Sequence, residues 1–105
     1  MNIRLVYVTT PSHEEAEKIA TCVVNEQLAA CANIIDGVTS IYRWEEKLCR
    51  ENETAMILKT TAAAGEKLIA RIRELHSYEC PCIVTLPIEN GHPDFLRWIE
   101  NQTTA

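Results

Sequence analysis

The densest group of soft metal-binding side chains lies near residue 80. Cys80 and Cys82 flank Pro81, and His76 precedes the first thiol by four residues. Thiolate sulfur and imidazole nitrogen are ligands that Cu(I) and Zn(II) prefer. The C-x-C spacing places both thiols on one side of an extended segment, but it lacks the second ligand pair of a structural zinc site. The pattern fits a soft-metal site, or a structural role in which Cys82 packs in a strand and His76 caps a helix.

The remaining cysteines form no metal-binding motif. The chain has five cysteines, an odd number at irregular spacing, which is typical of free thiols in a reducing compartment. Cys31 stands among alanines, where a small apolar thiol is most simply a core residue. We therefore expect a cytoplasmic protein without disulfides.

Aromatic side chains offer a second kind of site. Tyr42, Trp44 and Tyr78 could stack a ligand, or they could pack across neighbouring strands. The sequence shows no nucleophile with an evident base, no glycine-rich phosphate loop and no glycosidase-type carboxylate pair. We therefore expect a protein that is not an enzyme.

Length and charge limit the classes of function. The 105 residues match one domain, residues 1–105, and the 47% hydrophobic and 24% charged composition is that of a globular protein. The net charge of −5, without a basic cluster, argues against nucleic-acid binding. No apolar run approaches the length of a membrane span, and the N-terminus lacks the features of a secretory signal.

Hydrophobic periodicity predicts seven elements that would position these residues. Strands follow from β-branched and aromatic runs, and helices from apolar residues at three- and four-residue spacing. A capping box, Ser12 with Glu15, predicts the first helix start, and Gly37 predicts a bend or bulge. The predicted elements are a strand at 3–9, a helix from 12 to about 28, a strand at 30–44, a turn at 45–47, a strand at 52–60, a helix at 62–75, a strand at 83–86 and a helix after Pro93.

The order β-α-β-β-α-β-α indicates an α+β fold. It is typical of a ferredoxin-like split βαβ sandwich with an antiparallel sheet, here with an extra C-terminal helix. The strands at 3–9 and 55–58 are apolar on both alternating faces, although helices would cover only one. A second copy of the chain is the simplest cover, so we expect a homo-oligomer. The alternative is a monomer with an exposed apolar face.

Several motifs in register resemble one protein family. The sequence is similar to the CutA family of divalent-cation tolerance proteins in the segments Leu28–Ile34, Ser40–Trp44, Met56–Thr60 and His76–Pro81. The resemblance implies a ferredoxin-like fold in a tight homotrimer, similar to the nitrogen-regulatory PII proteins. It also implies a role in tolerance to copper and other divalent cations, with copper as a bound metal.

The resemblance assigns roles residue by residue. His76 matches the histidine of the family's H-x-Y-x-x-P motif, and Cys31 matches the L-A-A-C cysteine; both are metal candidates. Trp44, Glu53, Lys59, Tyr78 and Pro81 also match and would lie near clefts between subunits, where a small ligand could bind.

Three positions depart from the family pattern. Cys82 stands where a glutamate usually follows the proline, Glu46 replaces the glycine of the hairpin turn, and Val8 replaces a strand cysteine that some members carry. Cys80 and Cys82 would then supply the thiolates of a relocated copper site with His76. The leading hypothesis is a trimeric, non-enzymatic protein of copper and divalent-metal tolerance. The alternative is a PII-like signalling module that binds a small ligand in the intersubunit cleft and regulates a partner protein.

Overall fold

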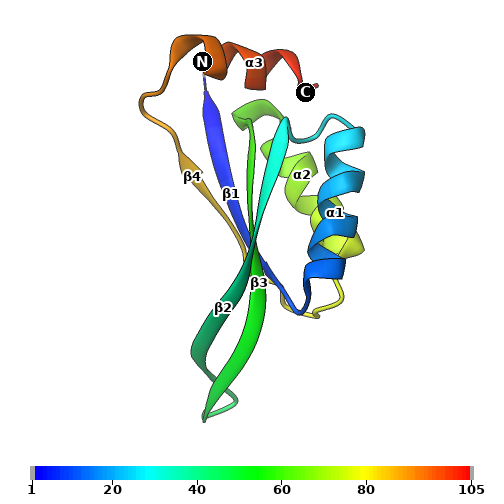
Figure 1. Ribbon diagram of the computed structural model, residues 1–105, viewed down its shortest axis with the longest axis vertical. Coiled ribbons are helices and arrows are strands. Elements are labelled where there is room, and N and C mark those ends of the chain that lie inside the picture. Colours follow the sequence, from blue (N-terminus) through cyan, green and yellow to red (C-terminus); the bar gives the residue numbers. More distant parts are fainter. Residues whose placement is uncertain (1, 105) are drawn as a thin grey trace.

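A computed structural model describes residues 2–104 and contains the predicted seven elements in the predicted order (Figure 1). They are β1 (Ile3–Thr10), α1 (His13–Asn25), β2 (Cys31–Trp44), β3 (Lys47–Thr61), α2 (Ala62–Leu75), β4 (Ile83–Pro87) and α3 (Pro93–Asn101). The strands form one antiparallel sheet in the order β2-β3-β1-β4. The α+β class and the split βαβ arrangement are therefore confirmed.

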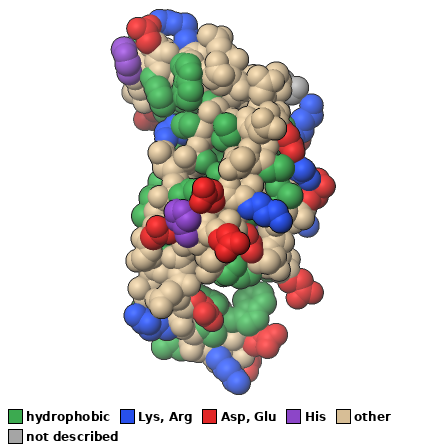
Figure 2. Space-filling model, turned by 45° about the vertical axis from the view of Figure 1, so that its right-hand side comes forward, with side chains coloured by type: hydrophobic (Ala, Val, Ile, Leu, Met, Phe, Trp, Pro, Cys, Tyr) green, Lys and Arg blue, Asp and Glu red, His purple; other side chains and the backbone are tan. Residues whose placement is uncertain are grey.

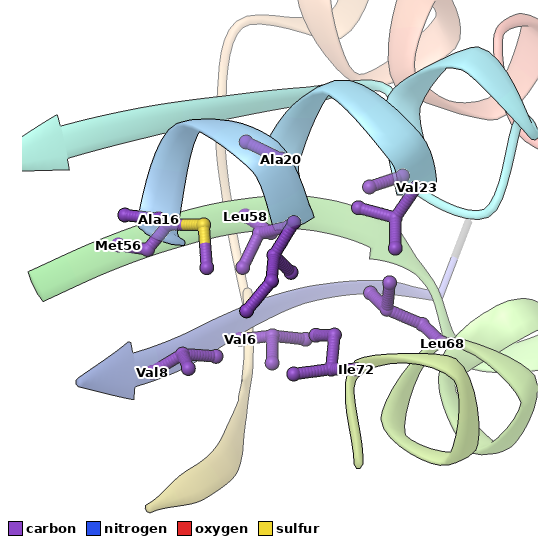
Figure 3. Packing of buried hydrophobic residues seen from close by; sticks show 11 residues of the cluster. Val6, Val8, Ala16, Ala20, Val23, Met56, Leu58, Leu68 and Ile72 are labelled. Carbon is purple, nitrogen blue, oxygen red and sulfur yellow. The ribbon is translucent and has the colours of Figure 1, made fainter. Parts of the chain in front are cut away.

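Helices α1 and α2 cover one face of the sheet, and α3 lies across the end near the N-terminus (Figure 1). The core lies between this pair of helices and the two central strands. Figure 3 shows side chains of α1 and α2 pointing toward those of β1 and β3. The labelled core residues are Val6, Val8, Ala16, Ala20, Val23, Met56, Leu58, Leu68 and Ile72. A smaller cluster of Ile3, Ala30 and Ile99 anchors α3.

The hairpin of β2 and β3 is longer than the sequence predicts. Strand β3 begins at Lys47 rather than at residue 52, because Lys47 to Glu51 pair with Trp44 to Ser40. The two strands extend well beyond the helices (Figure 1). They are joined by Glu45 and Glu46, which both adopt positive φ angles. The arm therefore projects from the body of the molecule.

Two local features bend the chain. The register of β2 against β3 shifts between Ile35 and Val38, and Gly37 lies there with a φ of 74°, which confirms the predicted bulge. Helix α1 ends at Asn25 instead of near residue 28, because Gln27 has a φ of 61° and cannot continue the helix.

The capping box of α1 is only half formed. The hydroxyl of Ser12 accepts a hydrogen bond from the Glu15 amide, as predicted. The Glu15 carboxylate does not complete the box, because it accepts hydrogen bonds from the amide and hydroxyl of Ser77 instead. Glu15 therefore ties the start of α1 to the segment after α2.

The second face of the sheet carries an apolar row that none of the helices within residues 2–104 covers. Leu5 and Tyr7 of β1 lie opposite Leu86 and Val84 of β4, and Ile57 of β3 lies opposite Tyr7. In the single chain Val84 is 52% exposed and Leu86 is 56% exposed. We call this surface the open face.

Figure 2 shows how charged side chains are distributed over one side of the molecule. Acidic and basic side chains are mixed over this side rather than gathered in a basic block. Among residues 2–104, no helix is both long and apolar enough to cross a membrane.

Candidate functional site

The site begins where α2 ends, at His76. The His76 amide donates a hydrogen bond to the Ile72 carbonyl, so the residue caps the helix, one of the two roles considered for it. Its side chain is fully buried. Nε2 donates to the carbonyl of Thr9 at 2.7 Å, and Nδ1 accepts from the Tyr78 amide at 3.1 Å. The imidazole therefore fastens the segment after α2 to the end of β1.

Tyr78 turns away from this anchor toward the hairpin. Its ring lies 4.8 Å from the His76 ring, between centroids, and its hydroxyl donates to Glu53 Oε2 at 2.9 Å. Burial, together with the adjacent Glu53 carboxylate, raises the pKa of the Tyr78 phenol well above its usual value. Tyr78 therefore stays protonated and fixes the carboxylate of β3.

A hollow of about 560 Å³ opens beside this pair, a volume within the range of small-molecule sites. Its walls come from the hairpin, from the end of β1 and from the segment that follows α2. Ten residues line it: Tyr7, Thr9, Ser40, Tyr42, Trp44, Glu53, Tyr78, Glu79, Cys80 and Cys82. Tyr42 and Trp44 lie two residues apart on β2 and so share a face of that strand.

The thiols of Cys80 and Cys82 line the hollow, and both residues are exposed. The structure does not bring His76 into a ligand set with them, because both of its ring nitrogens have protein partners. Within residues 2–104, no group of three or more His, Cys, Asp or Glu side chains is arranged to hold a metal ion. Only two soft donors of the sequence hypothesis, Cys80 and Cys82, therefore remain at the hollow.

Cys31 lies elsewhere. It is half-buried on the open face at the start of β2, where it pairs in register with Lys59. Its alanine neighbours predicted a core position for Cys31, and this prediction is wrong for the single chain. The Lys59 ammonium donates a hydrogen bond to Asn33 on the same strand as Cys31. Neither Cys31 nor Lys59 belongs to the lining of the hollow.

Most of the chain matches known proteins. A family model described as CutA1 divalent ion tolerance protein matches residues 4–102. The chain belongs to the CutA1 family. It is similar to the divalent-cation tolerance protein CutA of Thermus thermophilus, with 44% identity over 94% of this chain and 96% of that protein.

Comparison with other CutA proteins supports the fold and shows a difference in length. A solved CutA1 structure from Thermus thermophilus superposes with a TM-score of 0.95, with 43% identity over 97% of this chain and 99% of that one. The chloroplastic CutA protein of Arabidopsis thaliana is 39% identical over 94% of this chain. The chain spans only 54% of the length of that relative.

The hollow gathers three of the five residues that the CutA resemblance places in a cleft. Trp44, Glu53 and Tyr78 line it, whereas Lys59 and Pro81 do not. Val8, which replaces a cysteine of some CutA members, is fully buried and packs under the helices. A thiol at that position would therefore face the core and not the hollow.

Four lining residues were not anticipated from the sequence. Tyr7 and Thr9 alternate along β1 on the face away from the helices, and Ser40 is in phase with Tyr42 on β2. Side chains two residues apart on a strand share a face, so this alternation could have identified Tyr7, Thr9 and Ser40 from the sequence. Glu79 lacked any comparable pattern, because it lies in a segment without regular structure.

Proposed function

We propose that the protein acts in divalent-cation tolerance by binding copper as Cu(I) through Cys80 and Cys82, and that it does so without catalysing a reaction. The observation that carries this proposal is that both thiols are exposed and line the same hollow. Sulfur ligands select Cu(I) over harder cations, and the donor set at the hollow fits that preference. His76 is left out of the proposed ligand set.

A titration of the reduced protein with Cu(I), read by native mass spectrometry without oxygen, tests the proposal. We expect one saturable copper ion per chain. The variant Cys80→Ser/Cys82→Ser should lose this uptake, whereas Cys22→Ser/Cys49→Ser, which removes two thiols outside the lining, should keep it. Equal copper uptake by the two double variants would contradict the proposed site.

We also propose that three copies assemble through the open face and that the protein works in the cytoplasm. The exposed apolar row of the open face supports assembly, because a second copy would remove this surface from water. Five free thiols support a reducing compartment. The Arabidopsis relative is named as a chloroplastic protein, so fractionation of the source cells is the direct measurement of compartment.

A second candidate function is a signalling module of the PII type, in which a small ligand in the hollow regulates a partner protein. The observation that favours it is the size and the aromatic lining of the hollow. A ligand at 100 times its dissociation constant should stabilise the folded protein by about 2.7 kcal/mol. A thermal-shift comparison of metals with small organic ligands would rank the two functions.

A further inference from the structure

The hollow combines aromatic rings with negative charge. Four rings line it, those of Tyr7, Tyr42, Trp44 and Tyr78. They come from two strands and from the segment after α2, so three separate segments of the chain contribute rings to the lining. Aromatic faces carry a negative quadrupole that attracts cations within about 6 Å of the ring centre.

The charged groups of the lining are both acidic. Glu53 and Glu79 contribute carboxylates, and none of the ten lining residues is a lysine, arginine or histidine. Burial raises the pKa of Tyr42, and nearby Glu51 adds to this effect, so its phenol stays neutral as that of Tyr78 does. A cation entering the hollow therefore meets rings and carboxylates, and the basic residue nearest in register, Lys47 opposite Trp44 at the end of the hairpin, lies outside the lining.

We propose that the hollow binds a small organic cation whose methylated ammonium group packs against Trp44 and Tyr42 and faces the Glu53 carboxylate. This inference deepens the second candidate function and rests on the hollow being a ligand site. It is independent of the copper proposal, because it uses the rings and Glu53 and not the thiols. The hydrogen bond from the Tyr78 hydroxyl fixes Glu53 in place before the ligand arrives.

The lining favours this class over other ligands. Two carboxylates oppose an anion such as a phosphate or a carboxylic acid. A neutral apolar molecule would fit the rings but would strip water from Glu53 without a compensating charge. A methylated ammonium offers apolar surface to the rings and positive charge to the carboxylate in one group, which is how aromatic cages recognise it.

Isothermal titration calorimetry with two probes of the same shape tests the inference on the assembled, metal-free protein. Choline carries a trimethylammonium group, and 3,3-dimethylbutan-1-ol is its neutral carbon counterpart. We expect choline to bind at least about tenfold more tightly than the alcohol. Equal affinity for the two probes, or no binding of choline at millimolar concentration, would overturn the proposal.

Matched variants locate the binding. Glu53→Gln should weaken choline binding about tenfold, because it removes a negative charge at contact distance from the ligand. The control Glu89→Gln removes the same charge from an exposed position outside the lining and should leave choline affinity unchanged. Trp44 is exposed on the arm, so Trp44→Leu should leave the fold intact. This variant should also weaken choline binding. Unchanged choline affinity in both hollow variants would contradict the proposed position.

The thiol variant separates this inference from the copper proposal. Cys80→Ser/Cys82→Ser should lose Cu(I) and keep its preference for choline over the alcohol. If the preference is lost together with copper uptake, the ammonium proposal is wrong. If choline fails in the native protein while Cu(I) uptake depends on the two thiols, the ammonium proposal alone is overturned.

Discussion

Glu46 occupies a position where glycine is the favoured residue. It has a φ of 67° at the tip of the β2–β3 hairpin, directly after Glu45 with a φ of 50°. Two consecutive residues of positive φ are typical of a type I′ turn, in which the second position prefers glycine. Residues with a Cβ pay about 1 kcal/mol or more for this conformation.

We therefore expect Glu46→Gly to increase the free energy of unfolding by about 1 kcal/mol. Denaturant unfolding at one fixed protein concentration measures this change, because assembly makes stability concentration-dependent. Glu51→Gly is the matched control: it makes the same replacement within β3, where glycine weakens a strand, and should destabilise the protein. A destabilised Glu46→Gly variant would show that the turn does not carry this strain.

His76 was predicted from the sequence to be a metal ligand, but in the structure both of its ring nitrogens have protein partners. Replacement by alanine leaves the Thr9 carbonyl and the Tyr78 amide without their ring partner. Because the side chain is fully buried, we expect His76→Ala to lower the free energy of unfolding by about 1 to 3 kcal/mol. Copper stoichiometry should stay the same in the fraction that remains folded, and a selective loss of copper with native stability would restore His76 as a ligand.

The residue scale also explains why the sequence motifs identified only some of the residues that line the hollow. Trp44, Glu53 and Tyr78 carry motif signals and meet at the hollow. His76 carries a motif signal of the same kind, but its ring binds a carbonyl 67 positions earlier in the chain. Local spacing shows which residues can act as ligands, whereas only the packed structure shows which nitrogens are already occupied.

At the scale of elements, two glycines give opposite predictions for the same substitution. A Cβ added at Gly37 or at Gly65 meets no atom within 4 Å, so neither change creates a clash. Gly37 lies in the bulge of β2 with a φ of 74°, whereas Gly65 lies within α2. Backbone conformation therefore decides whether replacing each glycine by alanine stabilises or destabilises the protein.

We expect Gly37→Ala to cost about 1 kcal/mol through left-handed strain. Gly65→Ala should gain roughly 0.5 to 1 kcal/mol, because alanine is the better helix former. Parallel thermal and denaturant unfolding of the two variants tests both signs. The same sign in both variants would mean that packing, and not backbone preference, controls these positions.

The elements were predictable where burial imposes a period. Helix α2 has the predicted bounds, since Leu68 and Ile72 repeat on one face. The first five residues of β3 were missed because the arm is exposed on both sides and its sequence, Lys47 to Glu51, does not alternate. This part of β3 is a strand because its backbone pairs with β2. Backbone pairing does not require alternating hydrophobic side chains, so the sequence carries no sign of it.

At the scale of the whole molecule, the open face and the arm are the surfaces that the single chain leaves incomplete. The sequence predicted an apolar second face from strands without polar alternation, and the register confirms which residues share it. The hollow was less predictable, because it depends on how the arm and the segment after α2 approach β1. Periodicity assigns side chains to faces but does not fix the distance between segments.

The proposed assembly gives the last prediction. Leu86→Glu places a carboxylate in the apolar row of the open face, at a residue that is 56% exposed in the single chain. The isolated fold should tolerate it, but a subunit contact would bury the charge without a partner, which is strongly unfavourable. We expect native mass spectrometry to give three times the 11.9 kDa chain mass for the native protein and a single chain for the variant. Lys18→Glu, which adds a carboxylate at an exposed position of α1, should remain assembled. A Leu86→Glu variant that stays trimeric would show that the interface lies elsewhere, because an uncompensated charge buried at an apolar interface is strongly destabilising.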